Sequence, residues 1–201
     1  MENSSIIYSY GGGIYINLTN RCSNRCEFCI RTMTDGLGDA DSLWLEREPT
    51  VDEVIEELKE WPLAERGEVI FCGYGEPTER LDAVLDICRW IKGSSDLSAV
   101  RTRINTNGQA DLINGRETCG ELDGLVDAVS VSLNQCTAEK YQDLCHSRYG
   151  EAAYPAVLKY IDDLKRHVPE VAVSAVGCIG REDMLKCREI AREKNVIFRS
   201  R

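Results

Sequence analysis

Residues 17–29 read N-L-T-N-R-C-S-N-R-C-E-F-C and place Cys22, Cys26 and Cys29 in a C-x3-C-x2-C pattern. The stretch follows residues 13–18, a short apolar run rich in β-forming residues, so the cysteines lie in the loop that leaves a predicted strand. Thiolates are the soft ligands of iron–sulfur clusters, which normally take four of them. Three local thiols would leave one iron of a [4Fe–4S] cluster open to a small molecule.

Two other interpretations of this cysteine loop are open. The three thiols could hold zinc together with a distant cysteine or histidine, although zinc loops more often use C-x2-C pairs. They could also be scattered structural cysteines. The chain has ten cysteines, and the other seven show no C-x2-C pairing, so we expect most of them to be small buried side chains. They are Cys72, Cys88, Cys119, Cys136, Cys145, Cys178 and Cys187.

The length, composition and charge of the chain limit the classes of fold and function that it can have. The chain has 201 residues, 43% of them hydrophobic and 29% charged, which suits one globular domain. No apolar run approaches a membrane span, and the first residues lack the layout of a signal peptide, so we expect a cytoplasmic protein. The net charge of −10 argues against a nucleic-acid partner, because phosphate backbones attract clustered Lys and Arg.

Strand-like and helix-like segments alternate along the whole chain. Six strands in alternation with helices predict an α/β fold with a parallel sheet and right-handed crossovers. Periodicity does not distinguish a curved open sheet from a flat doubly wound one. The predicted strands are 13–18, 68–72, 100–104, 125–133, 171–176 and 195–198. The predicted helices are 50–58, 81–92, 111–122, 137–145, 152–167 and 183–194.

The cysteine loop resembles that of the radical S-adenosylmethionine (SAM) superfamily, whose hallmark is C-x3-C-x-aromatic-C after the first strand. Phe28 supplies the aromatic residue. The resemblance implies a (βα)6 partial TIM barrel with a curved parallel sheet, and one core domain over 1–201 without an auxiliary-cluster domain. Residues 17–31 and 43–49 also resemble the small TatD-associated radical SAM proteins.

Two further loops agree with this resemblance. Gly73, Tyr74, Gly75 and Glu76 are similar to the family's G-G-E-P loop, which binds the methionyl amino group of SAM. Glycine permits close backbone approach, and a carboxylate can accept from an ammonium. The alternative is a plain strand-to-helix turn. The next strand ends in Asn105-Thr106-Asn107-Gly108, like the T-N-G turn of many relatives, although Asn107-Gly108 alone is merely a turn.

The last three strands end in further candidate residues. Ser132 and Asn134 point the same way at a period of two, and in the family such residues contact the ribose and carboxylate of SAM. A solvated strand edge is the alternative. Ile179 lies in a segment, residues 176–180, that resembles the family's adenine-side loop, although its glycine spacing departs by one residue. Arg199 closes the sixth strand, where relatives supply backbone to adenine. Arg199 could equally be an exposed terminal charge. All these candidates fall at carboxyl ends of strands, where α/β sheets bind ligands.

The resemblance implies an enzyme with two cofactors, a [4Fe–4S] cluster and SAM. One electron, delivered by an external donor such as flavodoxin or ferredoxin, cleaves SAM to methionine and a 5′-deoxyadenosyl radical that takes hydrogen from substrate. The substrate is a small molecule, or a partner protein if the chain is an activase or modifying enzyme; a non-catalytic iron–sulfur or zinc protein is the third alternative. We also expect loop 32–48 to be a substrate lid, the chain to form a homodimer, and a functional link to a TatD-type hydrolase.

Overall fold

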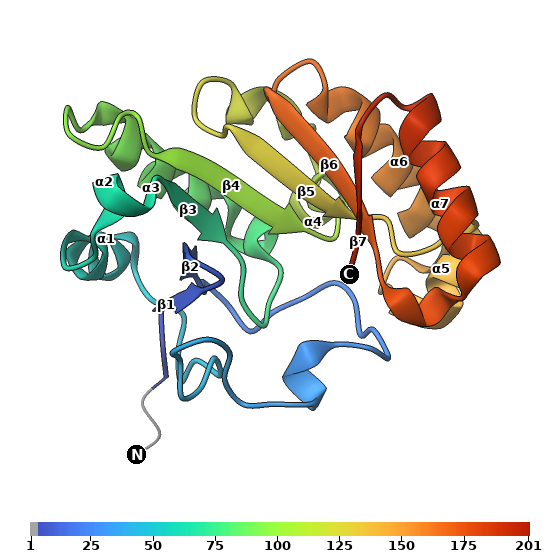
Figure 1. Cartoon of the computed structure of the whole chain (residues 1–201), viewed down its shortest axis with the longest axis horizontal. Helices are drawn as coiled ribbons and strands as arrows, with labels where there is room; N and C mark the ends of the chain where they lie inside the picture. Colours follow the sequence, from blue (N-terminus) through green and yellow to red (C-terminus); the bar gives the residue numbers. More distant parts are fainter. Residues whose placement is uncertain (1–3) are drawn as a thin grey trace.

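The computed structural model describes residues 4–201. Its fold is built on one seven-stranded sheet, which the reader can follow in Figure 1. The strands stand in chain order, and all neighbours are parallel except the antiparallel pair β1 and β2. A doubly wound sheet would reverse its strand order. The sheet curves without closing, which confirms the partial barrel. Its strands are β1 (Ile7–Tyr10), β2 (Gly13–Ile16), β3 (Glu68–Phe71), β4 (Arg101–Thr106), β5 (Ala128–Ser132), β6 (Glu170–Ala175) and β7 (Ile197–Ser200).

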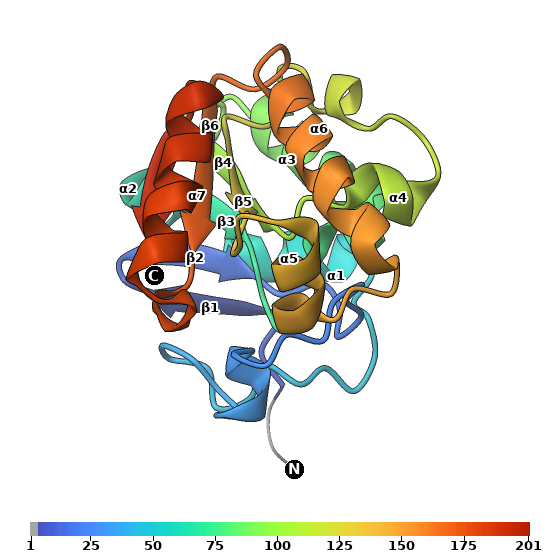
Figure 2. The ribbon, with the colours of Figure 1, turned by 90° about the vertical axis from the view of Figure 1, so that its right-hand side faces the viewer.

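Helices cover one face of the sheet, which we call the outer face. Figure 2 shows several of these helices along one side of the strands. Apolar side chains of that face, such as Val69, Ile104 and Val131, pack against buried helix residues, and this layer is the main core. No helix within residues 4–201 is long and apolar enough to cross a membrane. The helices are α1 (Val51–Lys59), α2 (Leu63–Arg66), α3 (Leu81–Gly93), α4 (Ala110–Asn114), α5 (Ala138–Cys145), α6 (Ala153–Leu164) and α7 (Arg181–Glu193).

The prediction of six strands misses β1, which forms a hairpin with β2. Gly11 and Gly12 have φ values of 56° and 89° and form a two-residue turn, and Tyr10 pairs with Gly13. Two glycines between β-forming runs are a hairpin signal, because both central residues of such a turn need positive φ. The strand prediction for 13–18 did not use this signal, although the two glycines directly precede that range.

Two predicted element boundaries were wrong for a common reason. The predicted helix 111–122 is split into α4 and a short 3-10 turn over Cys119–Leu122, because Gly115 takes the left-handed conformation that ends helices. The last strand begins at Ile197, two residues later than predicted, because Asn195 has a φ of 55° after α7. In both cases one residue with positive φ breaks a pattern that hydrophobic periodicity alone would continue.

Helix α1 begins with a capping box formed by Thr50 and Glu53. The Thr50 side chain accepts from the Glu53 N–H at 3.2 Å, and the Glu53 carboxylate accepts from the Thr50 N–H at 2.8 Å. We expect Thr50→Ala to lower the free energy of unfolding by about 1 kcal/mol, since it removes one partner of an otherwise unpaired helix N–H. Urea denaturation of the two proteins measures this. An unchanged midpoint would mean that the cap contributes nothing.

Candidate active site at the cysteine loop

The cysteine loop, residues 17–29, crosses the carboxyl ends of the central strands and is fastened along its length. On one side, the Asn17 amide donates to the Leu43 carbonyl at 2.8 Å. On the other, the Arg25 N–H donates to the carbonyl of Cys145 at 2.9 Å, and the Glu27 N–H to that of Leu144 at 3.2 Å, both at the end of α5. The loop therefore spans from the β2 side of the sheet to α5.

The Gly73–Glu76 segment packs directly on the backbone of the cysteine loop. The Glu76 N–H donates to the Arg21 carbonyl at 2.8 Å. A Cβ at Gly75 would lie 2.1 Å from the Thr19 carbonyl oxygen and 2.6 Å from that of Arg21. A Cβ at Gly73 would likewise lie 2.0 Å from the side-chain oxygen of Asn17. These glycines are therefore required by close approach of two protein segments, in addition to any ligand.

Glu76 is a buried carboxylate, 3% exposed, that joins β3 to β4. Its Oε1 accepts from the N–H and hydroxyl of Thr78 at 3.0 and 2.8 Å and from the Thr106 hydroxyl at 2.7 Å, while its Oε2 accepts from the Asn107 N–H at 2.6 Å. Burial raises the pKa of this carboxyl, and the hydrogen bonds act in the opposite direction. Acceptor capacity for a further donor, such as an ammonium, is left mainly on Oε2.

Replacing Glu76 with glutamine, its neutral isostere, tests the structural role of the carboxylate separately from any role in ligand binding. Glu76→Gln turns an amide NH2 toward donors on one side, so at least one buried hydrogen bond is lost. We expect the free energy of unfolding to fall by about 2 kcal/mol, as measured by urea denaturation of both proteins before any cofactor is added. Stability within about 0.5 kcal/mol of the parent would contradict the hydrogen-bond assignment.

Asn107 links the Glu76 segment to the cysteine loop. Its side-chain amide donates to the Ser23 hydroxyl at 2.8 Å and lies 3.9 Å from the Cys22 sulfur. Its carbonyl oxygen accepts from the Gln109 N–H at 2.9 Å. The T-N-G turn predicted at this position therefore also orients the first cysteine of the motif.

A second polar network holds the middle of the cysteine loop and was not anticipated from the sequence. The Gln109 amide donates to the Asn24 side-chain oxygen at 2.8 Å and to the Tyr141 hydroxyl at 2.9 Å, and the Ser147 hydroxyl donates to the Gln109 oxygen at 3.0 Å. All four residues are buried. Asn24 lies between Cys22 and Cys26, so this network fixes the backbone that presents two of the three thiols.

The three thiols suit an iron–sulfur cluster in their chemistry, because they are soft donors gathered within one loop. Burial raises the pKa of Cys22 to about 12, and a hydrogen bond with the Cys145 thiol raises that of Cys26. Both shifts favour the neutral thiol, so metal binding must displace these protons. Within residues 4–201, no three Cys, His, Asp or Glu side chains are arranged to hold one metal ion. A [4Fe–4S] cluster does not need that arrangement, because each of its three thiolates would bind a different iron.

Ser132 and Asn134 meet at Arg201. The Arg201 guanidinium donates to the Ser132 hydroxyl at 2.9 Å and approaches the Asn134 side-chain oxygen at 3.5 Å. The Asn134 amide donates to the Cys145 sulfur at 3.8 Å, which connects this group to the end of α5. Asn105, at the end of β4, is half-buried. The sequence did not identify Arg201 as part of this group.

The remaining predicted residues lie around the cysteine loop or away from it. Phe28 and Ile179 are partly buried against the main core, and Ile179 ends the short 3-10 turn after β6. Tyr74 is buried and its hydroxyl donates to the Thr34 carbonyl, so it anchors loop 32–48. The Arg199 side chain pairs with Glu170 at 3.0 Å, at the first residue of β6 and away from the cysteine loop.

Loop 32–48, expected to be a lid, is built onto the β1 side of the sheet. The Asp39 side chain accepts from the Ser9 N–H at 2.6 Å, and the Trp44 ring lies 5.1 Å from that of Tyr74. Leu43 joins Tyr74 in a small separate core. The loop therefore covers the β1 edge, which is the sealing role that an open sheet requires.

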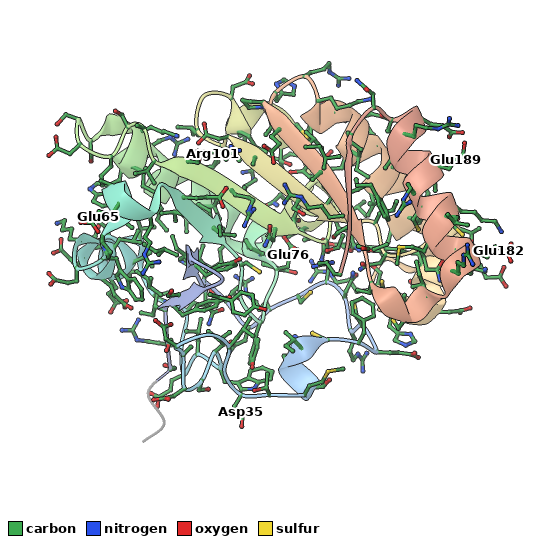
Figure 3. All side chains as sticks on the ribbon, in the orientation of Figure 1. Asp35, Glu65, Glu76, Arg101, Glu182 and Glu189 are labelled. Atoms are coloured by element: carbon green, nitrogen blue, oxygen red, sulfur yellow. The ribbon has the colours of Figure 1, made fainter. Side chains whose placement is uncertain are left out.

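The inner face of the sheet, opposite the helices, carries charges. Arg101 and Arg199 each pair with Glu170 at 3.0 Å, and Arg103 pairs with Glu68 at 3.4 Å. Figure 3 shows Arg101 near the amino end of β4, whereas Glu76 lies at the opposite edge beside the cysteine loop. A closed TIM barrel fills this space with branched apolar side chains. The open sheet instead presents a polar wall below the cysteine loop.

Two polar atoms on this inner face are buried without a hydrogen-bond partner in residues 4–201. They are the Arg103 Nε and the Ser174 Oγ, and Ser174 stands in register with Ser132 on the neighbouring strand. Buried polar groups normally find a partner, so these two atoms are exceptions on the inner face. The period-two alternation of β4 places Arg103 on the same face as Arg101. The sequence alone does not show which face of the sheet this is.

Comparison with known proteins agrees with this arrangement. The family model described as the radical SAM superfamily matches residues 16–191. The chain is 28% identical over 184 residues to the tungsten-containing aldehyde ferredoxin oxidoreductase cofactor-modifying protein of Pyrococcus furiosus, covering 89% of this chain and 47% of that protein. The chain therefore spans about half the length of this curated relative.

Solved structures share the fold at low sequence identity. A radical SAM methyltransferase from Sphaerobacter thermophilus superposes with a TM-score of 0.61 at 17% identity, covering 96% of this chain and 57% of that one. Streptococcus suis SuiB bound to the precursor peptide SuiA gives 0.60 at 17% identity, over 96% and 40% of the two chains. These likenesses support the fold alone. Because the family model covers well over half of its length, this chain belongs to the radical SAM superfamily.

Proposed function

We propose that this protein is a radical SAM enzyme that binds a [4Fe–4S] cluster through Cys22, Cys26 and Cys29 and generates a 5′-deoxyadenosyl radical. The observation that carries the proposal is the direct contact of the cysteine loop with the Gly73–Glu76 segment, through the 2.8 Å hydrogen bond from Glu76 N–H to Arg21. When bound, the cluster supplies one electron to SAM, whose carbon–sulfur bond breaks to give methionine and the radical. The family's use of these two cofactors supports this chemistry.

The chain's own residues bind and orient SAM in this proposal. Glu76 Oε2, with capacity for another donor, accepts from the methionyl ammonium beside Gly73 and Gly75. Ser132 and Asn134 bind the ribose and carboxylate from the end of β5. Backbone near Ile179 and Arg199 borders the adenine. The Arg199 side chain is not assigned to SAM, because it forms an ion pair with Glu170.

The substrate in this proposal is a polar molecule held against the charged inner face. The unpartnered Arg103 Nε and Ser174 Oγ support a ligand that carries hydrogen-bonding groups. A peptide or protein substrate is the second candidate, because the inner face is open: the Arg101 side chain is 48% exposed. SuiB, a structural neighbour, is bound to a precursor peptide, and the Pyrococcus relative is named for cofactor modification. Homodimer formation and a TatD-type hydrolase partner stay predictions.

The test is SAM cleavage by the reconstituted protein. After anaerobic reconstitution with iron and sulfide, addition of SAM and dithionite should produce 5′-deoxyadenosine and methionine in equal amounts, slowly even without substrate. Extract fractions that accelerate this formation then lead to the substrate. A reconstituted cluster whose spectrum does not respond to SAM, with no nucleoside product, would contradict the proposal.

A further inference from the structure

A basic hollow opens beside the cysteine loop on the α5 side. It has a volume of about 360 Å³ and lies between residues 22–25 and residues 142–148. Cys22 lines it, together with four basic side chains that we call the basic rim. None of its lining residues, all within the described part of the chain, is acidic. The basic rim consists of Arg25, Arg31, His146 and Arg148.

The basic rim contrasts with the charge of the whole chain. Acidic residues outnumber Lys and Arg by 34 to 24. Within residues 4–201, neither Arg25 nor Arg31 forms an ion pair, whereas Arg148 lies 3.3 Å from Glu79 and His146 lies 3.3 Å from Glu27. Two guanidinium groups without an ion-pair partner therefore lie at this position, with Arg25 exposed and Arg31 half-buried, so the rim is a positive patch on an acidic molecule.

The basic rim surrounds the same hollow as Cys22, one of the three proposed cluster ligands. Cys22 is reached from the hollow, and its neighbours Ser23 and Asn24 are buried and held by the Asn107 and Gln109 side chains. The SAM-binding residues proposed above lie at the Gly73–Glu76 segment and around Arg201 instead. The hollow thus offers a rigid approach to Cys22 that avoids those residues.

We propose that the basic rim is the docking surface for a small acidic electron-carrier protein of the ferredoxin or flavodoxin class. The inference rests on the proposed function, because reductive cleavage of SAM consumes one electron that must come from outside the chain. Complementary charge raises association rates from about 10⁵–10⁶ to as much as about 10⁹ M⁻¹s⁻¹ at low salt, even where the interface is small and transient. Such a complex forms and separates quickly enough to deliver one electron at a time.

Charge reversal on the rim tests the proposal. The variants are Arg25→Glu combined with Arg31→Glu, and separately Arg148→Glu, which lies outside the cysteine loop. After iron content is matched to the parent, the second-order rate of cluster reduction is measured by stopped-flow absorbance with a reduced acidic ferredoxin and a reduced acidic flavodoxin. We expect the double variant to react at least about tenfold slower at low salt, with the difference shrinking as salt screens the charges.

Two controls distinguish a docking defect from an effect of net charge and from a loss of SAM cleavage. Arg89→Glu combined with Arg192→Glu makes the same change in net charge on α3 and α7, and should keep the parent rate. Reduced methyl viologen, a small cation, should drive 5′-deoxyadenosine formation in all variants at the parent rate or faster. Equal slowing in the control variant, or no slowing in the rim variants, would overturn the docking surface. Slowing of the rim variants with viologen too would overturn it and assign the hollow to a small anionic ligand. Failure of the parent protein with viologen would contradict the proposed function itself.

Discussion

Replacement of Cys22, Cys26 or Cys29 by serine, one at a time, is expected to abolish SAM cleavage. The parent protein reconstituted without oxygen should hold about four irons and four sulfides per chain, and each variant should hold few or none. Serine keeps the size of the side chain but replaces a soft thiolate with a hard hydroxyl, which is a poor ligand for such a cluster. Iron and sulfide analysis, together with 5′-deoxyadenosine formation, measures the loss.

Two buried cysteines provide the matched controls. Cys88 and Cys187 are fully buried in the main core on α3 and α7, so Cys88→Ala and Cys187→Ala should leave the iron content unchanged. Each should cost only a modest amount of stability because a small apolar group is lost from the core, about 1 kcal/mol. Stoichiometric zinc in anaerobically purified parent protein would contradict the cluster assignment and restore the zinc interpretation.

Gly75→Ala is expected to be the most damaging single methyl addition at the site. The new Cβ would lie 2.1 Å from one carbonyl oxygen of the cysteine loop and 2.6 Å from a second. Both neighbours are backbone, so relief requires one segment to move off the other, at a cost of about 3 kcal/mol. Because Arg21 directly precedes Cys22, we expect reduced cluster content as well as a lower free energy of unfolding. Urea denaturation and iron analysis measure the two effects separately.

Gly93→Ala is the matched control for this effect. No atom lies within 4 Å of a Cβ added to Gly93 at the end of α3, and its φ is not positive. The same methyl group should therefore change the free energy of unfolding by no more than about 0.5 kcal/mol. If Gly75→Ala proved equally mild, the close approach of the two segments would not exist in solution.

Local patterns carried most of the secondary structure. The bounds of helices α1 and α3 were predicted within a residue or two, because helical periodicity depends on spacing along a single segment. The cysteine spacing likewise indicated the family before any tertiary contact was known. The signal for the hairpin turn at Gly11 and Gly12 is equally local, although the prediction of six strands does not include it.

The roles of individual side chains depended on tertiary structure. The sequence predicts a ligand-binding role for Glu76, and only the structure shows that its carboxylate also accepts four hydrogen bonds from Thr78, Thr106 and Asn107. Arg103 and Glu68 form an ion pair across two strands, and the basic rim joins the cysteine loop to the end of α5. Spacing along one segment determines a helix, a cap or a cysteine motif. Contacts between residues as distant as Asn24 and Tyr141 exist only because the curved sheet brings the carboxyl ends of its strands to one edge.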